Sequence, residues 1–192
     1  ELVDMGYAQQ TRSHGDYSLT IKFAAMGLQY LMKAEITDLA QPILAKLAKE
    51  TQELVRLGIV EQDALIWVSF AQGARDGLRY DPILEHGLRA HLTSTSSGHA
   101  WLSTMSDEEA IKLAMKQDSF VPNSRAPGPN APQTIAALVE RLNEVRRKGY
   151  AITMDSYLAG MSAISAPIMQ DRAKSAIGVI SVVGPSARLT QE

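Results

Sequence analysis

The chain has 192 residues, of which 45% are hydrophobic and 21% charged, and its formal net charge is −2. Such a length and composition are typical of one globular domain with a sizeable core and room for an appended element. The slight acidity argues against a domain that grips nucleic acid by itself. The absence of cysteine excludes disulfides and thiolate metal sites and favours the cytoplasm. No apolar run approaches the ~18 residues that a membrane span requires.

The first twenty residues contain a helix end followed by two short runs. The helix ends at Gly6, and residues 7–10 and 17–20 lie on either side of the glycine-containing turn 11–16. A helix end, a strand, a turn and a second strand are the layout of the wing in a winged helix. A plain surface hairpin fits the same residues, so both interpretations stay open.

Two helices and a pair of strands are expected next. Residues 21–33 place apolar side chains at helical spacing and form a candidate linker or dimer helix. The second helix begins at a Thr37–Asp38 cap and has Pro42 in its first turn, where proline is tolerated. Its apolar stripe consists of Leu39, Ile43, Leu44, Leu47 and Ala48. Residues 51–60 and 65–70 are predicted to pair as strands around a short turn.

The middle of the chain alternates loops with short elements. Residues 75–87 are punctuated by glycine, aspartate and proline, and residues 88–92 are predicted to form another strand. The stretch 93–104 opens with a hydroxyl-rich turn, 93–98, and continues as a short helix through Trp101 and Leu102. Ser106 and Glu109 form a capping box, which predicts a helix that starts there and ends at residue 115.

A loop and a long helix lead into the last part of the chain. Residues 122–132 are rich in proline, glycine and asparagine and are predicted to be a loop. Residues 133–148 form an amphipathic helix with basic side chains at its end and Gly149 as its stop. Three short apolar runs follow at 150–155, 161–168 and 177–183, which predicts adjacent antiparallel strands. The order of elements predicts an α+β fold, an antiparallel sheet flanked by helices.

Side chains alternate between the two faces along a strand, so the last three strands define two sets of residues. The first set, expected to pack against helices, comprises Tyr150, Ile152, Ile164, Ile168, Ile180 and Val182. The second set comprises Ala151, Thr153, Asp155, Met161, Ala163, Ser165, Ser181 and Val183. Because the second set is small, mixed and partly polar, it suits the wall of a hollow better than a filled core.

Motifs of catalysis are missing from the sequence. It has no G-x-S-x-G elbow, no P-loop and no G-x-G-x-x-G, and its four histidines show no metal-ligand spacing. We therefore predict no catalytic residue, no metal and no cofactor. One alternative stays open: a serine-dependent hydrolase that uses Ser97 with His99, although no third group is in place to orient a base.

The hydroxyl-rich turn is the stronger functional signal. Residues 93–98 place backbone N–H groups at the start of a helix, where unpaired donors and the helix dipole favour anions. A carboxylate bound there would gain charge-assisted hydrogen bonds. The same hydroxyls can also serve only to cap the helix, and the stretch alone does not separate the two interpretations.

In this order and spacing the features resemble the effector-binding part of the IclR (isocitrate lyase regulator) family of bacterial transcription regulators. The first matching pieces are Leu2 to Gly6-Tyr7, Gly15-x-Tyr17-x-Leu19 and Ala40-x-Pro42-x-Leu44-x-x-Leu47-Ala48-x-x-Thr51-x-Glu53. The next are Thr93-x-x-x-x-Gly98-x-Ala100-x-Leu102 and Arg146-x-x-Gly149-Tyr150-Ala151. The last are Gly160, Ala166-Pro167 and Ser181-x-x-Gly184-Pro185. The resemblance covers nearly the whole chain.

The resemblance implies a GAF-like effector-binding domain over residues 37–192. It also implies that residues 1–20 are the wing remnant of a winged helix-turn-helix, and that residues 21–36 are a linker and dimerisation helix. Most of the winged helix would be absent, as in a truncated or proteolysed chain. The implied partners are a small organic acid effector, operator DNA through the mostly absent N-terminal domain, and further copies in a homodimer or tetramer. A cytoplasmic protein that contacts no membrane is expected.

The resemblance also implies an effector site between the sheet and the start of the short helix. Its expected residues are Ser96, Ser97, Gly98, Ala90, Thr153, Asp155, Met161, Ala163, Ser181 and Val183. Ser96 and Ser97 would offer backbone N–H groups to the anionic end of the effector. The family often has an acidic residue where Thr153 stands, Glu near Ser156, Cys in place of Ala163 and a hydroxyl in place of Val183. The pocket is therefore expected to be roomier and less charged.

We accordingly expect a small-molecule-sensing domain of a DNA-binding transcription regulator, and not an enzyme. The expected effector has one polar end and an apolar body, such as an aromatic or medium-chain acid, and shifts the arrangement of the oligomer. A structural oligomerisation domain with a filled interior and no ligand is the second alternative, beside the hydrolase.

Overall fold

The computed structural model describes residues 1–10, 12, 15–33, 36–74, 76–81, 87–118, 128–170 and 175–190, without the side chains of 31–33 and 37. The described chain divides into two compact units, Glu1–Ala40 and Gln41–Glu192. The predicted loop 122–132 lies mostly outside the described residues, as do parts of the predicted turns 75–87 and 170–172.

The first unit is a small hairpin followed by a helix. β1 (Ala8–Gln10) and β2 (Tyr17–Leu19) pair antiparallel, which confirms the two predicted strands. α1 spans Ile21–Lys33, the predicted range. The hydroxyl of Thr20 donates to the carbonyl oxygen of Gly6 at 2.6 Å, and the ring of Phe23 meets the ring of Tyr7 edge to face. These contacts attach α1 to the hairpin.

α2 spans Ile36–Thr51, so it begins before the predicted cap and carries Pro42 in its second turn, not its first. In the second unit, Leu44 and Ala48 on this helix are buried, whereas Ile43 is exposed, so only part of the predicted stripe is covered. The hydroxyl of Ser69 donates to the side-chain oxygen of Gln41 at 2.9 Å, which holds this end of α2 against the sheet.

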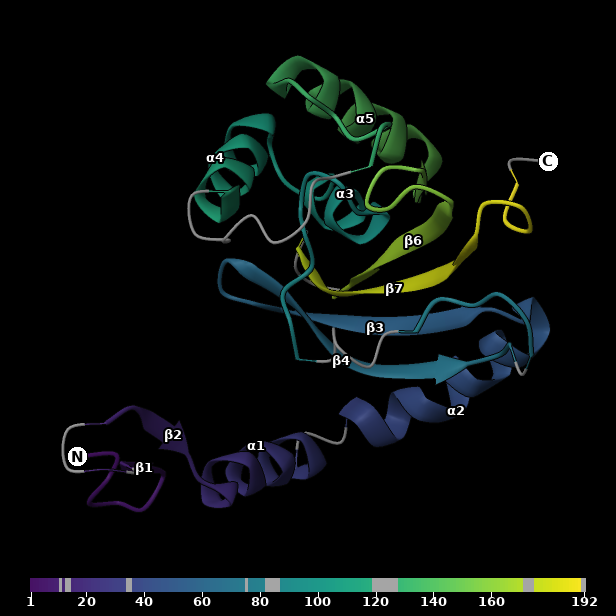
Figure 1. The fold of residues 1–192 in the computed structure, drawn as a ribbon. Coiled ribbons are helices and arrows are strands. Elements are labelled where there is room, and N and C mark those ends of the chain that lie inside the picture. Colours follow the sequence, from purple (N-terminus) through teal and green to yellow (C-terminus); the bar gives the residue numbers. More distant parts are fainter. Residues whose placement is uncertain are drawn as a thin grey trace. The chain divides into compact units, whose positions relative to one another are not determined.

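A five-stranded antiparallel sheet, in the order β4-β3-β7-β6-β5, is the centre of the second unit (Figure 1). Its strands are β3 (Leu54–Glu61), β4 (Ala64–Gln72), β5 (Ala151–Met154), β6 (Met161–Met169) and β7 (Ala176–Pro185). The predicted α+β class and the adjacent antiparallel strands at the end of the chain are therefore confirmed. β7 joins the two hairpins, because it pairs with β3 on one side and β6 on the other.

One face of the sheet, the α3 face, carries the helices α3 (Ser96–Leu102), α4 (Asp107–Asp118) and α5 (Ile135–Lys148) (Figure 1). The hydroxyls of Ser96 and Ser97 contact the hydroxyl of Ser165 on β6, which fixes α3 to this face. The main core lies between sheet and helices. Its large buried members are Leu65, Trp67, Leu92, Trp101, Leu102, Leu138, Leu142, Val145 and Val179.

The assignment of the two predicted strand faces was wrong. The mixed set, which includes Ser165, lies on the α3 face, whereas Ile152, Ile164, Ile180 and Val182 lie on the opposite face and are only half-buried. The physical reason is the reach of α2. It covers that opposite face beside Ser69, along β3 and β4, and leaves the part formed by β5, β6 and β7 less covered.

The predicted strand at 88–92 is shortened to a brief antiparallel pairing with β4. Arg89 forms an isolated bridge with Ile66, the N–H of Ala90 donates to the carbonyl of Leu65 at 2.7 Å, and the carbonyl of Leu88 accepts from the N–H of Trp67 at 3.1 Å. The side chain of Gln117 then accepts from the backbone N–H of Leu92 and donates to the carbonyl of Ala90, both at 2.7 Å. These two bonds occupy backbone groups through which the pairing could have continued. The segment turns instead and leads into α3.

Two of the predicted helix ends, the capping box at Ser106 and the stop at Gly149, are confirmed. The backbone N–H of Ser106 donates to the Glu109 carboxylate at 3.1 Å, and the Glu109 N–H donates to the Ser106 hydroxyl at 3.3 Å, which is the expected capping box. Gly149 ends α5 with a φ of 82°, a conformation that favours glycine. Arg146 on α5 bonds Asp107 at 2.6 Å and the carbonyl of Met105 at 2.9 Å, which ties α5 to the start of α4.

Gly98→Ala should destabilise the second unit by about 1–3 kcal/mol, because the new Cβ would lie 2.3 Å from the carbonyl oxygen of Leu92. Urea unfolding followed by tryptophan fluorescence measures this, since Trp67 and Trp101 are both buried in that unit. Gly27→Ala is the matched control, because a Cβ at Gly27 meets nothing within 4 Å and α1 belongs to the other unit. Equal unfolding midpoints for both variants would contradict the expected close approach.

Candidate functional site

A row of buried hydroxyls crosses the α3 face. Ser96 and Ser97 at the start of α3 have their Oγ atoms 2.6 Å and 3.0 Å from the Oγ of Ser165. Ser181 on β7 is the cross-strand partner of Ser165, so the two side chains share this face. The Ser181 side chain is 1% exposed, and its Oγ has no hydrogen-bond partner among the described residues. A buried hydroxyl without a partner is rare enough to require an explanation.

Arg56 continues the row on the next strand. It is the cross-strand partner of Ser181, and only 4% of its surface is exposed. Its guanidinium carbon lies 4.0 Å from the centre of the Trp67 ring and 5.5 Å from that of Tyr80, so the cation lies against aromatic faces. Burial of a charged group is costly unless opposite charge or aromatic surface compensates it. The row of hydroxyls therefore ends at the positive charge of Arg56, which lies against two aromatic rings.

An apolar cluster lies beside the hydroxyl row on the same face. Its buried members are Leu54, Met161, Ala163 and Val183, and the partly buried Phe70, Tyr80, Tyr157 and Leu158 pack against them. Thr153 is buried and pairs with Ala163 across β5 and β6, which places it at this end of the sheet. Polar row and apolar cluster together form a surface with one charged end and one apolar end.

The turn between β5 and β6 contains two further polar residues. Ser156 is buried, and its Oγ, like that of Ser181, has no partner among the described residues. Asp155 has a φ of 51°, and its carboxylate accepts from the N–H of Gly160 at 2.6 Å and from the hydroxyl of Ser186 at 3.2 Å. These bonds give Asp155 a role in shaping the turn.

A bidentate ion pair holds the backbone next to Tyr80 in place. The guanidinium of Arg188 donates to both carboxylate oxygens of the buried Glu53, at 2.6 Å and 3.0 Å, and also to the carbonyl of Leu78 at 2.9 Å. Gln72 donates to the carbonyl of Tyr80 at 2.9 Å. The two contacts anchor the backbone on either side of residue 79, and Tyr80 is thereby held over the apolar cluster.

The structure brings most of the predicted site residues together. Seven of them lie on the α3 face or at the α3 start: Ser96, Ser97, Thr153, Met161, Ala163, Ser181 and Val183. The remaining predicted residues have other contacts. Asp155 holds the turn, Ala90 packs in the main core beside Leu92, and the Gly98 N–H donates to the hydroxyl of the cap residue Thr95 at 2.9 Å.

Sequence reasoning missed Arg56, Tyr80 and Leu54 as parts of the site. Alternation along β3 could have found two of them, because Leu54 and Arg56 occupy the same face of one strand. The sequence does not give the register of β3 against β7, which is needed to place Arg56 opposite Ser181. No local pattern indicates Tyr80, which reaches the cluster from a loop.

The serine–histidine pair of the hydrolase alternative is not assembled. The Ser97 hydroxyl contacts Ser165, while Nε2 of His99 lies 2.8 Å from the carbonyl oxygen of Thr93 and donates to it, since a carbonyl only accepts. The hydroxyl of Ser94 does contact Nδ1 of His91 at 2.8 Å, but this is not the pair that the hydrolase alternative requires. Among the described residues no cluster of three or more acidic or histidine side chains could hold a metal ion.

The family model "Bacterial transcriptional regulator IclR C-terminal" matches residues 28–192. The fold, the site and this match define the class of protein, a bacterial transcription regulator. The chain belongs to the IclR family, and what it comprises is the C-terminal domain of such a regulator.

Curated relatives agree with this assignment. The transcriptional regulator BhcR of Paracoccus denitrificans is 29% identical over 166 residues, which are 85% of this chain and 56% of BhcR. KdgR of Escherichia coli is 26% identical over 188 residues, 98% of this chain and 68% of KdgR. The chain thus spans 56% and 68% of the length of these two relatives. Both relatives are HTH-type transcriptional regulators.

Solved structures show the same fold. An IclR transcriptional regulator from a Silicibacter species superposes with a TM-score of 0.79 at 21% identity, over 99% of this chain and 71% of that one. The IclR of Thermotoga maritima superposes with a TM-score of 0.72 at 21% identity, over 99% of this chain and 73% of that one. In the described parts of this chain, no helix is both long and apolar enough to cross a bilayer.

Burial of His99 predicts a pH dependence of stability. Desolvation lowers the pKa of His99 from 6.5 to about 4, so the folded state keeps the imidazole neutral. The unfolded chain binds the proton first as the pH falls, hence stability should be lost between pH 6.5 and pH 4, by about 3 kcal/mol. His99→Gln keeps a donor for Thr93 but cannot titrate. Urea unfolding of the wild type and of His99→Gln should therefore give a difference in unfolding free energy that changes between pH 6.5 and pH 4. A difference that stays constant over this range would contradict the lowered pKa of His99.

Proposed function

We propose that this domain senses a small organic acid for a DNA-binding transcription regulator. The observation that carries the proposal is the pair of buried hydroxyls, Ser181 and Ser156, that have no partner among the described residues. Unsatisfied buried donors cost free energy, and a bound polar ligand would recover it. Family membership supports the same conclusion, because the chain is the C-terminal domain of a regulator.

The chemistry of the site favours an amphipathic acid. Its carboxylate would lie along the hydroxyl row, between the start of α3 and the cation of Arg56, where charge-assisted hydrogen bonds are strongest. Its apolar body would contact Leu54, Ala163 and Val183. Alanine and valine at the last two positions leave more apolar room than larger or hydroxyl-bearing side chains. An aromatic or medium-chain acid therefore suits the site better than a very small keto acid.

The regulatory step would be a shift between two arrangements of the oligomer. A small molecule can shift such an equilibrium only through different affinities for the two arrangements, and a coupling of ~1–3 kcal/mol is typical. The β1–β2 hairpin would be the wing of a winged helix-turn-helix that contacts operator DNA, with α1 as the linker. A protein with these roles would work in the cytoplasm.

The effector proposal predicts opposite effects for two serine substitutions. Ser181→Ala should leave the stability of the ligand-free domain unchanged or raised, since it removes a buried hydroxyl that has no partner in the described part of the chain. It should weaken binding of an aromatic acid such as benzoate about tenfold. Ser162→Ala is the matched control, because Ser162 is equally buried but donates to the hydroxyl of Ser186 at 3.1 Å. That control should lower stability and keep the affinity.

Thermal shift and isothermal titration measure both quantities. A ligand that binds only the folded state must raise the melting temperature, by an amount that grows with its concentration over Kd. Benzoate and medium-chain acids should stabilise the protein more than pyruvate or glyoxylate. Tight binding of glyoxylate or pyruvate with no response to aromatic acids would refute the proposed effector class. A panel in which no acid shifts the transition would favour the purely structural alternative.

Self-association through α1 is the second expectation. Its apolar side chains are exposed in the single chain, with Leu28 at 63% and Met26 at 48%. Leu28→Glu should shift the protein from dimer toward monomer in analytical ultracentrifugation. The reason is that the new charge would be buried among the apolar side chains between the α1 helices of the two copies. Gln29→Glu adds the same charge at the neighbouring exposed position and should leave the dimer intact. A wild-type monomer at high concentration would contradict the assignment of α1 as a dimer helix.

A further inference from the structure

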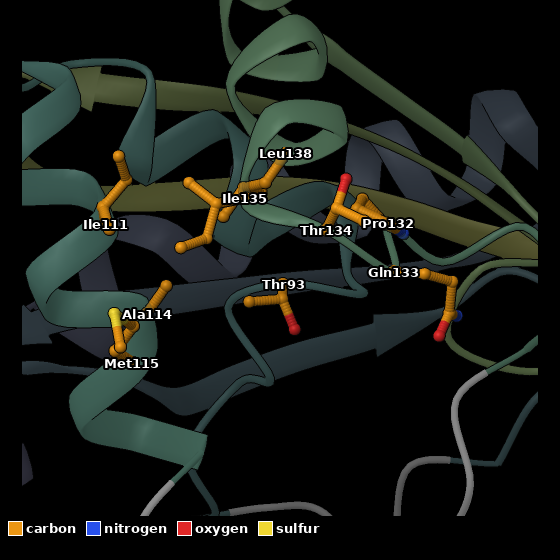
Figure 2. A pocket seen from close by; sticks show the side chains of 9 residues that line it. All are labelled: Thr93, Ile111, Ala114, Met115, Pro132, Gln133, Thr134, Ile135 and Leu138. Atoms are coloured by element: carbon orange, nitrogen blue, oxygen red, sulfur yellow. The ribbon is translucent and has the colours of Figure 1, made fainter.

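A pocket lies between α4 and α5, beside the turn that precedes α3 (Figure 2). Its volume is about 170 Å³, and it shares no lining residue with the hydroxyl row. The lining residues are Thr93, Ile111, Ala114, Met115, Pro132, Gln133, Thr134, Ile135 and Leu138. Figure 2 shows the side chains of Ile111, Ala114 and Met115 on one wall and those of Ile135 and Leu138 on the adjoining wall.

The pocket carries no charged side chain, and its polar groups already have protein partners. The Thr134 hydroxyl accepts from the N–H of Ala137 at 3.1 Å and caps α5. The Gln133 amide donates to the carbonyl of Ala131 at 3.1 Å, and the Thr93 hydroxyl lies 3.4 Å from Nδ1 of His91. A carboxylate would therefore lose its hydration here without gaining a cation, whereas an uncharged molecule would lose little.

The volume of the pocket and the exposure of its lining residues further define the molecule that could bind in it. A dry apolar cavity of roughly 150 Å³ is large enough for a benzene ring. Two apolar residues of the lining are open to solvent: Met115 is 58% exposed and Ile135 49% exposed. A ligand can therefore enter, and covering these side chains would contribute about 25 cal/mol for each Å² of apolar surface removed from water.

We propose that this pocket binds a small uncharged molecule, largely apolar and of the size of a single aromatic ring. The ligand class differs from that of the effector site, which has a buried cation at one end. The pocket and the hydroxyl row are also neighbours along the chain. The carbonyl of Thr93 accepts from His99 on α3, and Thr93 is followed within the same turn by Ser96 and Ser97. An occupant that contacts Thr93 thus touches the segment that leads into the hydroxyl row.

Benzyl alcohol and benzoate are the two probes, because they share a ring and differ in charge. With ¹³C-labelled isoleucine and methionine methyl groups in the whole 192-residue chain, NMR spectra report on the pocket. Benzyl alcohol should shift the signals of Ile111, Met115 and Ile135 in a saturable manner. Benzoate at the same concentration should leave these signals in place, whatever it does at the hydroxyl row. Because the two probes test different sites, a negative result with benzyl alcohol would refute this pocket without refuting the proposed effector site.

A pocket-filling variant provides the second arm. Ala114→Leu adds three carbons to the wall and should weaken benzyl alcohol binding at least about tenfold. Ala136→Leu, the same substitution at an exposed position of α5, should leave the affinity unchanged. No shifts with benzyl alcohol, equal shifts with benzoate, or an undiminished affinity in Ala114→Leu would each overturn the proposal. If Ala114→Leu does not fold, the comparison of the two probes on the wild-type chain decides alone.

Discussion

The contact on which the second unit depends is the close approach of α3 to β6. The hydroxyls of Ser96 and Ser97 lie within hydrogen-bond distance of Ser165, and Gly98 lies against the backbone of Leu92 with no room for a Cβ. Only small side chains permit a helix backbone to come this near a sheet. The hydroxyl row is consequently enclosed between helix and sheet instead of facing water. Ser181, which has no hydrogen-bond partner among the described residues, lies in the same enclosed row.

The elements that could be predicted from sequence are those with local causes. The capping box at Ser106 and the glycine stop at Gly149 each involve residues within a few positions of each other, and both are found as expected. The end strands likewise follow from short apolar runs. The face assignment failed because it depends on which helix covers which side of the sheet. Neither the small residues of α3 nor the limited reach of α2 can be judged from alternation alone.

The candidate site likewise contains residues that could be predicted from the sequence and residues that could not. Ser181, Ala163 and Thr153 were predicted from alternation together with the family resemblance, and they do share a face. Arg56 was missed, because its burial is created by Trp67 and Tyr80 and by its register against Ser181. The predicted strand at 88–92 is shorter than expected for a related reason. The amide of Gln117, about 25 positions away in the chain, takes the backbone groups of Leu92 and Ala90, and no local propensity encodes such a bond.

The central place of β7 has a consequence for synthesis of the protein. β3 with β4, and β5 with β6, form hairpins that can assemble as soon as each leaves the ribosome. Each hairpin then presents an open edge toward the gap that β7 fills last, and Arg188 reaches Glu53 only later still. Open strand edges attract strands of other chains. Until β7 is in place, the facing edges of β3 and β6 are therefore the part of the sheet that is open to pairing with other chains.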